Sequence, residues 1–173
     1  MSTQRPLSLL ILLLLSSTFA HGSSGLSAEE HYLQSKNNKI YAQQLVNDVV
    51  KKHPDLLVVA LHSKQSYEPV SRMIASNIDR IGKKDDADDQ VVATERKIII
   101  APNTAGLNKI EVLLPLLDSN EICIGTLGLV FKFEKGGNSV DVLKKALLLQ
   151  KQLSSKIANS AALGRSVTLE AVD

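Results

Sequence analysis

The fold class follows mainly from residues 110–133, which read IEVLLPLLDSNEICIGTLGLVFKF. Two apolar runs, residues 110–117 and 122–133, have strand character, and the polar segment 118–121 between them has the composition of a turn. The sequence therefore predicts an antiparallel hairpin whose second strand is the longest in the sheet.

Three residues inside this hairpin have restricted or unusual backbone properties. Pro115 cannot donate a hydrogen bond to a neighbouring strand, so we expect it near a strand end or a bulge. Gly125 and Gly128 weaken the second strand but permit the close approach of a helix, a bulge or a ligand.

Three further strands are expected upstream of the hairpin. Residues 56–61 are continuously apolar, which is typical of a short strand buried on both faces, and residues 72–78 and 97–101 complete a set of five. The polar segment 79–89 leads into a short helical pattern, and residues 102–108 have turn composition.

Two longer helices flank these strands. Ser27 and Glu30 match a capping box, and apolar residues then recur on one helical face until Pro54, which predicts one helix over residues 27–53. Asn138 or Ser139 can cap a final helix. Its apolar stripe consists of Val142, Ala146, Leu149, Leu153 and Ile157.

The predicted fold class is α/β (α+β), with a five-stranded antiparallel sheet, a long N-terminal helix and a C-terminal helix. The helices around Leu45 and Leu149 should cover one sheet face, because both carry an apolar stripe. We expect one domain over residues 27–160, followed by a flexible C-terminal tail over 161–173.

Length and composition exclude several classes of protein. The chain has 173 residues, of which 44% are hydrophobic and 22% charged, so it has room for one globular domain and is neither disordered nor a polytopic membrane protein. Aromatic residues make up 3%, so the core should be aliphatic. A net charge of +2 disfavours a dedicated nucleic-acid binder.

The N-terminus has the order of a signal peptide: Arg5, an apolar run over residues 9–15, and small residues ending at Ala20. We expect residues 1–20 to be cleaved, residues 21–26 to form a linker, and the mature chain to be periplasmic or secreted without inserting in a membrane. The alternative is an uncleaved anchor. Cys123 is the only cysteine and has no intrachain disulfide partner, and a small buried side chain is its expected role.

The order of elements resembles the PAS-like fold, and the leading helix with its signal peptide resembles the exported relative of that fold, the Cache sensor domain. The resemblance rests on residues 74–78 (IASNI), 80–84 (RIGKK), 111–118 (EVLLPLLD) and 124–131 (IGTLGLVF), which are similar to segments of small exported bacterial proteins of this type. It covers nearly all of the mature chain.

This resemblance implies a sensor-like domain that binds a small molecule. Cache domains typically pass a signal to a cytoplasmic output module, whereas this chain ends soon after its last helix, so any output should come from a separate envelope signalling protein. The residue pattern of the amino-acid-binding members does not match, so the resemblance implies no particular ligand.

In PAS-like topology the polar wall of a pocket lies on the first two strands and the following insert. The candidate ligand-binding residues are therefore His62, Arg72, Asn77, Arg80 and Lys83. For an anionic ligand, Arg72 or Arg80 would supply paired donors, Lys83 a point charge, and Asn77 and His62 directional hydrogen bonds. A basic patch would survive here only if the acidic residues 85–89 turn outward. Alternatively, His62 bonds to the backbone and these cations pair with surface carboxylates.

Other chemistry is not expected. Reading residues 85–96 as a calcium loop puts Gln90 at the glycine position and Arg96 at the glutamate position, so the acidic run is interpreted as a solvated turn with helix caps. Histidine spacing predicts no metal site, and we expect no cofactor and no catalytic residue. The competing hypothesis is a non-catalytic envelope interaction module with a filled core, whose long N-terminal helix pairs with a second copy or another protein.

Overall fold

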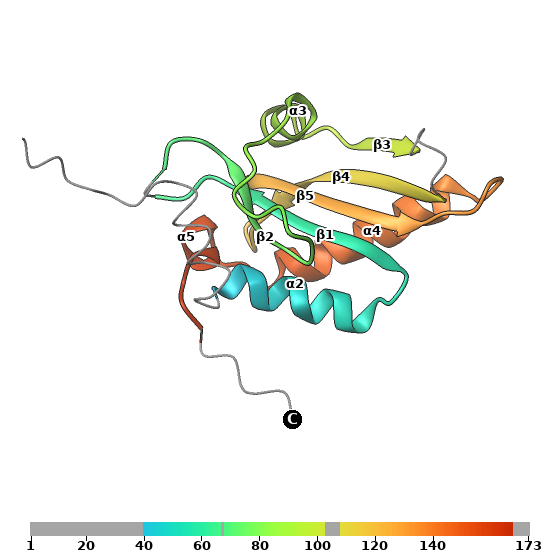
Figure 1. The fold of residues 1–173 in the computed structure, drawn as a ribbon. Coiled ribbons are helices and arrows are strands. Elements are labelled where there is room, and N and C mark those ends of the chain that lie inside the picture. Colours follow the sequence, from blue (N-terminus) through green and yellow to red (C-terminus); the bar gives the residue numbers. More distant parts are fainter. Residues whose placement is uncertain (1–39, 67, 103–107, 168–173) are drawn as a thin grey trace, which may run out of the picture.

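The structure, a computed structural model, describes residues 40–66, 68–102 and 108–167. One antiparallel sheet in the strand order β2-β1-β5-β4-β3 forms its middle layer (Figure 1). The strands are β1 (Leu56–Ser63), β2 (Arg72–Ser76), β3 (Ile99–Pro102), β4 (Lys109–Leu117) and β5 (Cys123–Lys132). The helices are α2 (Tyr41–Lys52), α3 (Ala87–Glu95), α4 (Ser139–Ser154) and α5 (Ser160–Leu163).

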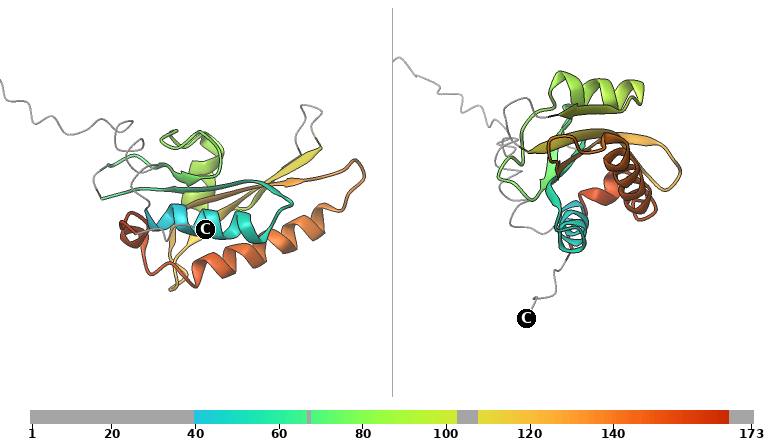
Figure 2. Two further views of the ribbon diagram at one scale, coloured as in Figure 1. Left: turned by 60° about the horizontal axis from the view of Figure 1, so that its bottom comes forward. Right: turned by 90° about the vertical axis from the view of Figure 1, so that its right-hand side faces the viewer.

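The two sheet faces are covered differently. Helices α2 and α4 lie on one face and α3 lies on the other, as the end-on view in Figure 2 shows. Leu45 and Leu149 are buried among the aliphatic residues of the first face, where Leu127 and Leu129 of β5 also point. The predicted fold class is therefore confirmed, with both stripe-bearing helices on the same face.

The β4–β5 hairpin is confirmed by its register, in which Leu114 pairs with Leu127. Its turn is held by Asp118, whose Oδ1 accepts hydrogen bonds from the backbone N–H groups of Asn120 at 2.8 Å and Ile122 at 3.0 Å. The turn is joined to the connection between α4 and α5, because the Ser119 N–H donates to the carbonyl of Ile157 at 2.7 Å.

Pro115 lies two positions before the end of β4 and beside the register shift between Leu116 and Leu117, as expected for a residue that lacks an N–H. The pairing of β3 with β4 extends only as far as Leu113, so at Pro115 the β3 side of β4 has no paired strand. The missing donor therefore leaves no gap in that ladder.

The predicted N-terminal helix is wrong at its centre. Ile40 has an extended backbone and forms a bridge with Ser166, and the Tyr41 N–H donates to the carbonyl of Arg165 at 2.8 Å, so α2 begins at Tyr41. The predicted signal peptide, linker and first half of that helix, residues 1–39, lie outside the described residues.

The C-terminal tail was predicted to begin at residue 161, and this boundary is also wrong. Helix α5 includes Leu163, which is fully buried, and Ser166 pairs with Ile40 as described above. The chain after α4 is therefore part of the fold at least as far as Ser166. Within the described residues, no helix combines the length and apolarity needed to cross a bilayer.

The packing of α4 can be tested with two adjacent leucines. Leu149 is 1% exposed and Leu148 is 62% exposed. Leu149→Ala should lower the free energy of unfolding by about 2–5 kcal/mol, because it removes buried methyl groups and leaves a cavity. Leu148→Ala should change it by less than about 0.5 kcal/mol. Urea denaturation monitored by circular dichroism measures both, and equal losses would place α4 outside the core.

Candidate functional site

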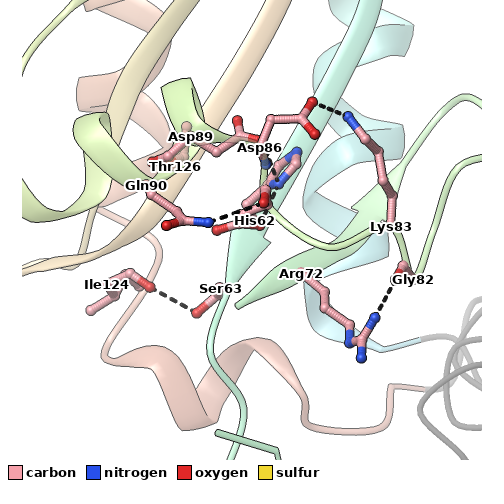
Figure 3. A network of polar contacts seen from close by, with 11 residues as sticks. His62, Ser63, Arg72, Gly82, Lys83, Asp86, Asp89, Gln90, Ile124 and Thr126 are labelled. Atoms are coloured by element: carbon pink, nitrogen blue, oxygen red, sulfur yellow. Dashed lines mark hydrogen bonds and ion pairs between the residues drawn. The ribbon is translucent and has the colours of Figure 1, made fainter. Parts of the chain in front are cut away.

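A buried histidine marks the site on the α3 face of the sheet. His62 follows Leu61 in β1 and pairs with Thr126 of β5, so side-chain alternation directs it away from the aliphatic core that holds Leu61 and toward α3. The register of β1 against β2 also shifts at this point, because β2 has one extra residue between the partners of Leu61 and His62. His62 is 4% exposed, and its Nδ1 lies 2.8 Å from Asp85 Oδ1 and 3.6 Å from Asp89 Oδ2 (Figure 3). We call these three residues the His62–Asp85–Asp89 cluster.

Asp89 is positioned by the start of α3. The helix begins with a capping box, in which the Asp89 carboxylate accepts the Asp86 N–H at 3.0 Å. The Asp89 backbone carbonyl accepts a hydrogen bond from the Thr126 hydroxyl at 2.8 Å. Because Thr126 is the β5 partner of His62, this bond fixes the first turn of α3 directly over the histidine.

Asp85 is positioned by the segment that runs beside β2. Its N–H donates to the Ser71 carbonyl at 3.2 Å, and the neighbouring Lys84 forms a bridge with Arg72. The Gln90 side chain donates to the Asp85 carbonyl at 3.3 Å. The cluster is therefore held by the backbone pairing of this segment beside β2 and by the capping box of α3.

Interpretation of the acidic run as a solvated turn is wrong for two of its members. The side chains of Asp85 and Asp89 are only 3% and 8% exposed, whereas Asp86 and Asp88 are exposed. The expectation that His62 bonds to the backbone is also wrong, since its ring contacts the carboxylates of Asp85 and Asp89. One nitrogen and two carboxylate oxygens of the cluster lie within 4.8 Å of one another, which is a possible metal-ligand set.

A cavity of about 310 Å³ adjoins this cluster, between the sheet and the segment that leads into α3. We call it the α3 cavity. Small side chains on β1 and β5 leave the space open, among them Ala60 and Gly128. Its polar and charged wall consists of His62, Arg80, Lys83, Asp86, Asp88, Asp89, Lys109 and Glu111, and its apolar wall of Val58, Ala60, Met73, Ile78, Leu113, Gly128 and Val130.

A larger depression of about 750 Å³ lies elsewhere, at the start of β5, and includes Cys123, Gln65 and Ser160 on its wall. The Cys123 side chain is half-buried there, with its Sγ 3.2 Å from the Ala93 carbonyl. None of the sequence-predicted ligand residues lines this depression. The α3 cavity is the better candidate because it gathers three of them beside a buried charged cluster.

The structure brings His62, Arg80 and Lys83 to the α3 cavity but not Arg72 or Asn77. The Arg72 Nε donates to the Glu68 carboxylate at 2.6 Å, and its Nη1 donates to the Gly82 carbonyl at 3.1 Å. Asn77 is hydrogen-bonded to the backbone of β1: its Oδ1 accepts the Val59 N–H at 2.8 Å, and its Nδ2 donates to the Leu57 carbonyl at 3.0 Å. Arg72 therefore holds the insert at Gly82, and Asn77 holds the chain after β2 against β1.

Sequence reasoning missed six residues of this site: Asp85, Asp86, Asp88, Asp89, Lys109 and Glu111. For the β4 pair a signal was present, because Lys109 and Glu111 alternate with buried Ile110 and Val112 and so belong to one strand face. For Asp85 and Asp89, a spacing of four residues was the only local hint.

The cavity wall is electrically mixed and not the basic patch expected for an anionic ligand. Asp86 forms an ion pair with Lys83, and the hydrogen bond from that lysine lowers the pKa of the Asp86 carboxyl. Glu111 differs in direction: although the residue is exposed overall, partial desolvation beside the cavity raises the pKa of its carboxyl, and the nearby charge of Asp89 adds to the effect. Carboxylates therefore face the cavity together with the cations.

No protein-family model and no curated protein sequence matches the chain. Solved structures that resemble it include a protein assigned as a GAF sensor from Burkholderia vietnamiensis, with 10% identity, a TM-score of 0.48 and coverage of 79% of this chain and 94% of that one. A GAF domain from an Acinetobacter phosphoenolpyruvate-protein phosphotransferase has 17% identity, a TM-score of 0.45 and coverage of 79% and 94%. The E. coli DcuS sensor domain has 19% identity, a TM-score of 0.40 and coverage of 74% and 86%. Such identities carry no information on ligand or activity.

The Glu111 carboxyl gives a pH test of the cavity's electrostatics. Because its pKa is raised in the folded protein, its contribution to stability is present in acid and is lost as pH rises through the folded pKa. Glu111→Gln should therefore gain in melting temperature relative to the unmodified protein between about pH 4 and pH 7. A difference that stays constant with pH would contradict the partial desolvation of this carboxyl.

Asp55→Asn is the control of opposite sign. A hydrogen bond from Lys145 lowers the pKa of Asp55, so its contribution is present at neutral pH and is lost as pH falls through the folded pKa. This variant should be less stable than the unmodified protein at neutral pH, and the gap should close in acid. Thermal unfolding followed by circular dichroism across the pH series measures both variants.

Proposed function

We propose that this chain is a small-molecule-binding domain of sensor type and that its ligand occupies the α3 cavity. The observation that carries the proposal is a space of about 310 Å³ that combines an apolar floor with convergent charged groups. That volume is at the lower end of the range of about 300–1,000 Å³ for ligand sites in proteins. A metabolite-sized ligand suits such a space.

The charges on the wall specify the ligand class. Arg80 and Lys109 line the cavity, and no ion pair within the described part of the chain engages them, so they can bind a carboxylate. Asp88 and Glu111 line the same space and can accept hydrogen bonds from an ammonium group. We therefore propose a small ligand with both an anionic and a cationic group, which refines the small-molecule ligand expected from the sequence, for which only an anionic group was considered.

Export and signalling belong to the same proposal. The signal-peptide pattern of residues 1–20 supports a periplasmic or secreted protein, and the resemblance to Cache domains supports a sensor that acts through a separate envelope protein. We propose binding without catalysis, because the sequence carries neither a nucleophile elbow nor a phosphate-binding loop.

The competing interaction hypothesis has less support. It required an apolar face of the N-terminal helix that is free to pair with a partner. In α2 that face carries Ala42, Leu45 and Val46, all buried in the core against the sheet. Homodimer formation remains a prediction that light scattering can test.

Arg80→Ala tests the ligand site. A thermal-shift screen with amino acids, dicarboxylates and diamines should identify a zwitterionic compound that stabilises the protein, by about 2.7 kcal/mol at 100 times its dissociation constant. Arg80→Ala should then weaken binding by at least about tenfold, the equivalent of about 1.4 kcal/mol, because it removes a charged donor from the cavity wall.

Lys84→Ala is the matched control, since Lys84 is an exposed cation of the same segment that does not line the cavity. It should leave affinity unchanged. Isothermal titration calorimetry measures both variants, and equal affinities for Arg80→Ala and Lys84→Ala would remove Arg80 from the site. A complete screen without any shift would contradict the proposed function.

A further inference from the structure

We propose that the His62–Asp85–Asp89 cluster binds a divalent transition-metal ion of the Zn²⁺ type at the inner end of the α3 cavity. The inference rests on the cluster itself and does not require the small-molecule ligand proposed above. Four features of the structure support it. The ligand atoms are suitably spaced, the charge of the two carboxylates is not balanced, one carboxylate oxygen has no hydrogen-bond partner among the described residues, and the ligand residues are held in place by other bonds.

The spacing of the ligand atoms suits a metal ion. Bonds of about 2.0–2.2 Å from Zn²⁺ to imidazole nitrogen and carboxylate oxygen put neighbouring ligand atoms about 3.0–3.6 Å apart. In the structure His62 Nδ1 lies 2.8 Å from one carboxylate and 3.6 Å from the other, and all three ligand atoms lie within 4.8 Å of one another. Small side-chain rotations are therefore enough to admit the ion.

The charge of the cluster also requires a cation. Two carboxylates are nearly fully buried, and an unpaired buried charge costs several kcal/mol. Lys83, a lysine of the same segment that lines the cavity, is engaged with Asp86. Among the described residues, the only cation-forming side chain in an ion pair with Asp85 or Asp89 is His62, which can carry at most one positive charge. A divalent ion would balance both carboxylates.

One oxygen atom of the cluster has no partner. Asp85 Oδ2 is buried, and no hydrogen-bond donor in the described part of the chain reaches it. The Asp85 side chain is 3% exposed, and its other oxygen already contacts His62. Buried carboxylate oxygens are normally hydrogen-bonded or bound to metal, so an ion at the cluster supplies the missing partner.

The ligands are held in place before any ion arrives. Asp89 is fixed by the capping box and by Thr126, and Asp85 by its backbone bond to Ser71. One imidazole and two carboxylates favour Zn²⁺ and similar ions over Ca²⁺, which takes six to eight oxygen ligands. Three protein ligands leave at least one position open, and His62 and Asp89 both line the cavity, so that position faces the space where a ligand would lie.

The test uses the tag-free chain, which is treated with a chelator and then dialysed to remove that chelator. Isothermal titration with Zn²⁺, and visible absorption after addition of Co²⁺, should show one ion bound per chain and a d–d spectrum of low coordination number. His62→Ala and Asp85→Asn should each weaken Zn²⁺ binding by at least about tenfold, since changes that only touch a ligand's supporting partners already cost about 10–100-fold.

Matched controls separate the site from adventitious binding. His53→Ala removes a histidine on the far side of the sheet, and Glu95→Gln removes an exposed carboxylate at the end of α3 that does not line the α3 cavity, so both should bind Zn²⁺ as the unmodified chain does. Without metal, Asp85→Asn should melt no lower than the unmodified protein, because it removes a buried charge and keeps an oxygen for His62.

Three outcomes would overturn the proposal: no stoichiometric uptake of Zn²⁺ or Co²⁺, equal affinities for Asp85→Asn and Glu95→Gln, or equal affinities for His62→Ala and His53→Ala. A protein that binds no metal and loses stability on Asp85→Asn would instead have a protonated His62 shared between the two carboxylates. Each of these results leaves the small-molecule screen unaffected, so failure of the metal site and failure of the proposed function can be distinguished.

Discussion

Strand β5 must be covered on both of its faces, and the rest of the structure depends on this constraint. Its pairing with β1 and β4 puts it at the centre of the sheet. Leu127, Leu129 and Phe131 point into the aliphatic core under α2 and α4, while Thr126, Gly128 and Val130 point toward α3. One face is therefore filled by large side chains, whereas the other has small ones and needs a separate covering segment.

That covering segment is the chain between β2 and β3, and it makes the second face polar. It is anchored at two places, by the backbone pairing of Lys84 with Arg72 beside β2 and by the hydrogen bond from Thr126 to the first turn of α3. Between these anchors the segment covers the α3 cavity, which stays open because Ala60 of β1 and Gly128 of β5 are small. The charged groups of the insert consequently face the sheet and not only the solvent.

The buried cluster and the cavity are two consequences of the same arrangement. The capping box that starts α3 is formed by Asp86 and Asp89, and the position of the helix over β5 then brings Asp89 to His62. The alternation of side chains along β1 directs His62 toward the same point, opposite Thr126 of β5. Helix capping and strand alternation, which are local features, thus combine into a charged site with two buried carboxylates.

Local patterns in the sequence predicted the hairpin, the five strands, the α4 stripe and its Asn138 cap, because turn chemistry and periodicity act over a few residues. The site was predicted only in part: His62, Arg80 and Lys83 line the cavity, whereas Arg72 and Asn77 are occupied by bonds to the insert and to the edge of β1. Neither the pairing of Ile40 with Ser166 nor the contact of His62 with Asp85 has a local signature, since the partners are distant in sequence. Such contacts follow from how the sheet, its bulge and the α3 segment pack together, and composition and spacing do not encode that packing in any short stretch of chain.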